Sequence, residues 1–227
     1  MGFGVGGVAM FLSLPRLGAS LSTLIVQCVS AVVAAGVEWA WLGPRLTPAQ
    51  LGFVALTLAG IVIGLLPRSL PRVSPAEWGA GIVWALLSAA GQGVGAVISR
   101  KAFAVAAAAQ ERIDPASAAY QRALGGLAVA ALVLALAARW WPERPRETGR
   151  AWPWVLGNAL TGPVFGVTCL QWALRTIPAG IVQPIVAAAP LLTIPFAAWL
   201  EGTRPRPAYY AGALLAVAGV SGLMVWR

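Results

Sequence analysis

The chain consists largely of apolar runs long enough to cross a lipid bilayer, separated by short segments rich in arginine and proline. Hydrophobic residues make up 59% of its 227 residues and charged residues 10%, a balance that soluble domains do not show. In the hydrocarbon core only helices and closed barrels satisfy the backbone, and long runs without alternation favour helices. The sequence therefore predicts an all-α integral membrane protein.

A membrane-spanning helix needs ~20 residues, so the length leaves room for roughly eight spans with short connections. The N-terminal run lacks a basic segment ahead of it and is expected to be a spanning helix rather than a signal peptide. Residues 102–115 are expected to extend the fourth helix and then form a loop. The predicted spans are 2–14, 21–42, 51–66, 78–99, 116–138, 152–174, 180–200 and 207–226.

The formal net charge of +9 does not come from a basic patch. Arginine and lysine mostly stand singly or in pairs between apolar runs, where they suit helix ends that meet lipid headgroups. This placement favours the lipid bilayer as a partner and argues against nucleic acid. The expected location is the inner (plasma) membrane of a prokaryotic cell, crossed many times.

Catalytic chemistry is poorly supported by the residues at hand. The chain has no histidine, and its two cysteines, Cys28 and Cys169, lie inside apolar runs as small core residues. The spans offer a single internal acid, whereas acid–base or metal chemistry needs paired or clustered ligands. We therefore expect no catalytic residue, no metal site, no cofactor and no enzymatic activity.

The stretch 14–68 is echoed, at an offset of 159 residues, by the stretch 173–227. In both copies an apolar run ends in a short basic turn, and a second apolar run follows. Such a duplicated pair of membrane-length segments is typical of transporters built from two repeats. The residues that coincide are Gly43 with Gly202, Arg45 with Arg204, Pro48 with Pro207, and Gly60 with Gly219.

The segment 67–77, with three prolines and two arginines, is the best candidate for a boundary between the repeats. Residues 1–70 are then a partial first repeat of three helices, and residues 78–227 a complete second repeat of five. The first copy lacks the two helices that open the second. A repeat with an odd number of helices, duplicated in tandem, gives the inverted topology that many transporters share.

The second copy contains, in order, Pro178-Ala179-Gly180, Pro190, Glu201-Gly202, Arg204, Gly212 and Gly219. With these motifs it resembles the EamA-type half of the drug/metabolite transporter superfamily. The first copy keeps part of the same pattern, although Pro44 stands where that family usually has glutamate. The resemblance implies a ten-helix carrier that moves small metabolites by alternating access, of which this chain would hold three plus five helices. The motifs that the first copy keeps are Leu42-Gly43, Arg45-Leu46-Thr47 and Gly60.

Polar side chains inside lipid are costly, and each one therefore suggests a function. Two polar faces at helical spacing stand out, either as the lining of one cavity or as surfaces for helix packing. Glu38, at the end of the first face, is either a proton-coupling or substrate-binding carboxylate, or an interfacial group beside Trp39 and Trp41. The faces are Thr23, Gln27, Ser30, Ala34 and Glu38 in one helix, and Ser88, Gln92, Gly95 and Ser99 in another.

Prolines inside the sixth and seventh spans either free backbone groups for a substrate or merely bend the helices. Arg122, near the start of the fifth span, either meets an anionic substrate or anchors the helix at the interface. The candidate cavity residues are Gln27, Ser30, Glu38, Gln92, Ser99, Asn158 and Gln183.

The sequence thus predicts a secondary transporter, an exporter or permease for small organic metabolites. The alternative is a non-transporting or partner-dependent membrane subunit derived from a degenerate transporter. Assembly into a homo-oligomer is left open.

Overall fold

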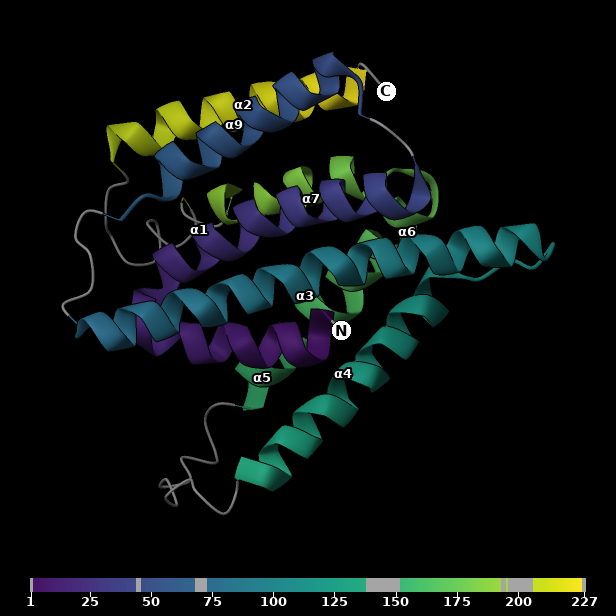
Figure 1. The fold of residues 1–227 in the computed structure, drawn as a ribbon, viewed down its shortest axis with the longest axis horizontal. Helices are drawn as coiled ribbons and strands as arrows, with labels where there is room; N and C mark the ends of the chain where they lie inside the picture. Colours follow the sequence, from purple (N-terminus) through teal and green to yellow (C-terminus); the bar gives the residue numbers. More distant parts are fainter. Residues whose placement is uncertain are drawn as a thin grey trace.

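The computed structural model describes residues 2–43, 46–67, 73–137, 152–192, 195 and 206–225. The predicted loop 139–150 and the second basic turn at 201–205 lie outside these residues. The described chain is helical and contains no β-strand, as predicted, and its helices form a bundle from which α4 leans away (Figure 1). The elements are η1 (Gly2–Gly6), α1 (Gly7–Leu42), α2 (Pro48–Leu65), α3 (Pro75–Ala108), α4 (Pro115–Ala137), α5 (Trp152–Ala159), η2 (Leu160–Gly166), α6 (Val167–Thr176), α7 (Ala179–Ala187) and α9 (Pro207–Val225).

Five described helices are long and apolar enough to cross a membrane. The predicted count of eight spans is not confirmed. The segment Gly4–Leu42 covers the first two predicted spans and is interrupted by the non-helical residue Gly18, and the sixth span is divided into α5, the π-helical η2 and α6. Pro163 lies inside η2, where a missing backbone N–H accounts for the irregular hydrogen bonding. The five spans are Gly4–Leu42, Pro48–Leu65, Pro75–Ala108, Pro115–Ala137 and Pro207–Val225.

Helix α1 reverses its direction at Gly18, which has φ 75° and ψ 163° and so adopts a conformation that side chains disfavour. The contacts of α1 with α3 show this reversal, because the numbering along α3 falls as the first arm proceeds and rises along the second arm. The start of the chain lies beside Gly95, and Leu17 beside Gly81 near the beginning of α3. The second arm then runs parallel to α3 as far as the Glu38–Arg100 contact. Helix α3 therefore packs between the two arms of α1.

Proline and a capping box define the starts of α2 and α3. Thr47 Oγ1 accepts from the Gln50 backbone N–H at 3.2 Å, and Gln50 Oε1 accepts from the Thr47 N–H at 2.9 Å. Ser74 and Glu77 repeat this arrangement at α3. These reciprocal bonds satisfy backbone donors that a helix start leaves open, which explains why both helices begin where they do.

Helices α2 and α9, the closing helices of the two predicted repeats, pack closely through glycines. A Cβ atom placed on Gly60 would lie 2.5 Å from Gly212 O, and one placed on Gly219 would lie 2.8 Å from Phe53 O. The two contacts are reciprocal under the offset of 159 residues, because Gly219 is the equivalent of Gly60 and Gly212 is the equivalent of Phe53. The helices run antiparallel, since higher numbers on one meet lower numbers on the other.

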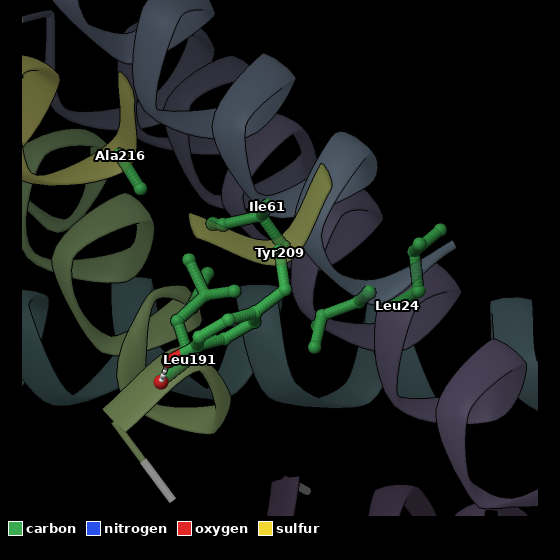
Figure 2. Close-up of a cluster of buried hydrophobic side chains, with 7 residues drawn as sticks. Leu24, Ile61, Leu191, Tyr209 and Ala216 are labelled. Atoms are coloured by element: carbon green, nitrogen blue, oxygen red, sulfur yellow. Dashed lines mark hydrogen bonds between the residues drawn. The ribbon is translucent and has the colours of Figure 1, made fainter. Parts of the chain in front are cut away.

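One cluster of buried apolar residues joins this pair to α1 and to the chain after α7 (Figure 2). Tyr209 is 6% exposed, and its hydroxyl donates to Leu191 O at 2.5 Å. The hydrogen bond satisfies a phenol that would otherwise be buried without a partner. The cluster consists of Leu24, Ile61, Leu65, Ala187, Leu191, Tyr209 and Ala216.

Replacing Tyr209 with phenylalanine is expected to lower the free energy of unfolding by about 1 kcal/mol, because the packing remains and the hydrogen bond is lost. Tyr210→Phe is the matched control, since the neighbouring Tyr210 is 55% exposed. Unfolding by SDS in mixed micelles, followed by tryptophan fluorescence, measures both variants. Equal stability of the two variants would contradict the buried bond.

Candidate functional site

Glu38 lies in a buried ion pair at the end of α1. Its side chain is 3% exposed, and Arg100 Nε donates to its Oε1 at 3.0 Å. The Gly180 backbone N–H donates to its Oε2 at 2.9 Å. Trp39 and Trp41 beside it are exposed, so the carboxylate points into the bundle rather than towards the surface.

This ion pair also holds the break between α6 and α7. Arg100 Nη1 donates to Leu174 O near the end of α6, while Glu38 accepts from Gly180 near the start of α7. A cation thus meets a helix C-terminus and an anion meets a helix N-terminus, which is the arrangement that helix dipoles favour. The network fastens α1, α3, α6 and α7 together.

A cavity of about 600 Å³ lies between the first arm of α1 and helices α3, α4, α6, α7 and α9. Gln92 is the predicted site residue that lines it, and most of its other walls are apolar. Cys169 lines it and is exposed. The lining residues are Gly2, Gly7, Met10, Phe11, Gln92, Arg122, Gly166, Val167, Cys169, Leu170, Ala173, Ile177, Val182, Ile185, Val186 and Met224.

A second cavity, of about 310 Å³, adjoins the first at Gly2 and Arg122, which line both. Arg122 Nη1 donates to Ser99 Oγ at 3.2 Å and to Gly95 O at 3.4 Å. Ser99 is the predicted site residue in this cavity. Gln171 also lines it, and this side chain is only 3% exposed.

The polar face predicted on α1 and the one predicted on α3 do not line a common cavity. A Cβ atom placed on Gly93 would lie 2.7 Å from Ser30 O and 3.0 Å from Ala34 N, so the face on α1 packs directly against α3. The face on α3 turns instead to the start of the chain, where Ser88 Oγ donates to Gly6 O at 2.7 Å.

The remaining candidates are dispersed. Gln27 is half-buried, and its carbonyl accepts from Ser30 Oγ at 3.0 Å. Asn158 is exposed on α5, and Gln183 is buried in α7. None of these residues lines the 600 or the 310 Å³ cavity. Substrate binding by any of the seven candidates stays a prediction.

Two polar residues outside the seven candidates, Arg122 and Gln171, also line the 310 Å³ cavity. The sequence leaves Arg122 as either a substrate contact or an interfacial anchor, and in the structure it lines both cavities. The signal for Gln171 was weak, because one glutamine in an apolar run also suits helix packing. Among the described residues, no group of three or more His, Cys, Asp or Glu side chains could hold a metal ion.

Residues 79–225, from α3 to the end of α9, match the sequence profile of the EamA-like transporter family. A solved structure described as "Crystal structure of protein" is similar to this chain with a TM-score of 0.76 and 21% sequence identity. The match covers 99% of this chain and 75% of the other, and at this identity it shows a shared fold. No curated protein matches the chain.

Proposed function

Because the chain belongs to the EamA-like transporter family, we propose that it is a secondary carrier of small organic metabolites in a prokaryotic inner membrane. Family membership and the five apolar helices make it a multi-pass membrane protein of the drug/metabolite transporter type. The observation that carries the proposal is the 600 Å³ cavity between helices of the bundle. Its apolar walls with a few polar groups, such as Gln92 and Arg122, are typical of small-molecule sites.

We further propose that the chain holds three plus five helices of a ten-helix bundle built from inverted repeats. The reciprocal contacts between α2 and α9 support this arrangement. Gly60 of α2 packs against Gly212 of α9, and the equivalent pair, Gly219 of α9 and Phe53 of α2, also packs together. A two-fold axis in the membrane plane produces such reciprocal contacts, and it also makes the related helices antiparallel. On this proposal residues 1–70 and 78–227 rock against each other to expose the cavity to alternate sides.

Transport into proteoliposomes tests the proposal. We expect the purified chain to move at least one solute of a broad metabolite panel faster than protein-free vesicles do. Gln92→Ala should reduce kcat/KM for that solute by about tenfold, the effect of losing one hydrogen bond to a bound ligand. Thr161→Ala, on the exposed surface of η2, is the control and should leave transport unchanged.

Glu38→Gln belongs in the same experiment because it separates two roles of this carboxylate. Loss of pH-driven accumulation with solute exchange intact would support a coupling role. If accumulation and exchange are both lost and the protein is also less stable, the result would support the structural role that the ion pair with Arg100 indicates.

The alternative is a partner-dependent membrane subunit, and one observation favours it. Helix α5 has no buried residue, and in α4 only Ala119 and Gly126 are buried. These faces are available to lipid, to another subunit or to a second copy of the chain. A folded, membrane-inserted chain that moves no solute of the panel would support this alternative over the carrier.

A further inference from the structure

We propose that the two cavities that meet at Arg122 form a binding site for an amphipathic organic anion that also carries a hydrogen-bond donor. The proposal rests on the transport function proposed above and names its substrate class. The anionic group would occupy the 310 Å³ cavity with Arg122 and Ser99, and the apolar body would occupy the 600 Å³ cavity.

The cationic part of the site is the Arg122 guanidinium. It lies two turns inside an apolar helix, a position where a charged residue usually marks a solute pathway. Two of its hydrogen bonds go to Gly95 O and Ser99 Oγ, at 3.4 and 3.2 Å, and so hold the guanidinium beside the 310 Å³ cavity. A planar guanidinium fork matches a carboxylate, and Ser99 Oγ offers a further polar contact beside it.

The donor requirement comes from Gln171. Its Oε1 atom is fully buried and accepts no hydrogen bond from any described residue. The side chain lines the same cavity as Arg122 and Ser99. A buried acceptor without a partner is costly, so the side chain would gain a hydrogen bond by turning Oε1 towards a hydroxyl or ammonium group on the ligand.

The apolar body follows from the walls of the larger cavity. Met10, Phe11 and Met224 line it together with Leu170 and Ile185. Methionine side chains are flexible and adapt to different apolar shapes, so these walls select the body of the ligand by its low polarity more than by its exact shape.

A third cavity, lined by basic side chains, adjoins this site. This cavity, of about 270 Å³, shares Phe103 and Ile113 with the 310 Å³ cavity. Arg112 and Arg175 line it against one acidic residue, Glu111. It lies where α3 and α6 end, and its excess positive charge would raise the local concentration of anions.

Mandelate is a suitable probe, because it combines a carboxylate, a hydroxyl donor and a phenyl ring. Mandelamide lacks the charge, and phenylacetate lacks the hydroxyl. Binding is measured as protection of Cys169 from maleimide in nanodiscs, with Cys28 replaced by alanine so that one thiol reports. Cys169 is exposed and lines the apolar cavity, so a bound phenyl ring should shield it.

We expect mandelate to protect Cys169 at concentrations about tenfold lower than mandelamide does, with phenylacetate in between. Arg122→Gln should remove the preference for mandelate over mandelamide, and Arg122→Lys should retain part of it. Gln171→Leu should remove only the preference for mandelate over phenylacetate. Arg16→Gln, a cation in α1 that lines none of the three cavities, should change neither preference.

Equal protection by mandelate and mandelamide in the unmodified chain would overturn the inference, as would a preference that survives Arg122→Gln. Proteoliposome transport separates this failure from failure of the carrier function. Transport of neutral solutes without any preference for the anion would sink the anion site and leave the carrier. If protection of Cys169 depends on the charge of the ligand but no solute is transported, the anion-binding site is supported and the proposed carrier function is refuted.

Discussion

Replacing Arg100 with methionine is expected to lower the free energy of unfolding by about 3–5 kcal/mol, because it leaves a buried charge without its counter-ion. Glu38 would keep a single backbone donor, the Gly180 N–H, and Leu174 O would lose the guanidinium. Methionine fills much of the same volume, so the loss of charge dominates. SDS unfolding in mixed micelles gives the free energy.

A double-mutant cycle separates the ion pair from other effects of each substitution. Glu38→Gln keeps an oxygen for the Gly180 N–H and removes the negative charge. The double variant should therefore be more stable than Arg100→Met alone, because it contains no unpaired buried charge. Arg16→Met is the control, because it removes a cation from α1 that does not contact Glu38. Additive effects in the cycle would show that Glu38 and Arg100 are not coupled.

The sequence identified Glu38 but not its partner. Helical spacing placed Glu38 on a polar face, and its position among apolar residues predicted a special role. Arg100 looked like a helix-end anchor beside Lys101, since that is where basic residues usually stand. The pair joins residues 62 positions apart in different helices, and only the packing of α1 against α3 brings them together.

Most of the helices can be predicted from the sequence, because their length follows from apolar runs of membrane length and their starts from prolines, both of which are local features. Helix α3 does extend past the predicted span, to Ala108, before a loop. Pro163 does fall in an irregular stretch of the sixth span. The number of spans is a different matter. The predicted separation between the first two spans corresponds to the reversal of the chain at Gly18, which the backbone angles and the contacts with α3 both show.

Helical periodicity predicted which side chains share a face, but not what each face contacts. Gln92 and Gly93 are neighbours in sequence, yet Gln92 lines a cavity and Gly93 packs against Ser30. A rotation of the helix by one residue position separates a side chain that lines a cavity from a residue that packs against another helix. Such a rotation depends on the tertiary packing of small residues, which the sequence of one helix does not specify.

Leucine at Gly60 is expected to destabilise the chain by at least about 3 kcal/mol, the upper range for overpacking a close contact. The added side chain would have to displace Gly212 O and the backbone of Ala216. Gly52→Leu is the matched control in the same helix, because nothing lies within 4 Å of a Cβ atom there. That control should stay within about 0.5 kcal/mol of the unmodified chain.

The proposed two-fold repeat adds a second expectation to this prediction. Gly219 occupies the equivalent place in α9, where a Cβ atom would lie 2.7 Å from Thr57 N and 2.8 Å from Phe53 O. If α2 and α9 are related by a two-fold axis, Gly219→Leu must cost about as much as Gly60→Leu. Combining the two should cost less than their sum, because the first substitution already separates the helices that the second would push apart. A Gly60→Leu variant as stable as Gly52→Leu would contradict the packing, and unequal single effects would contradict the two-fold relation.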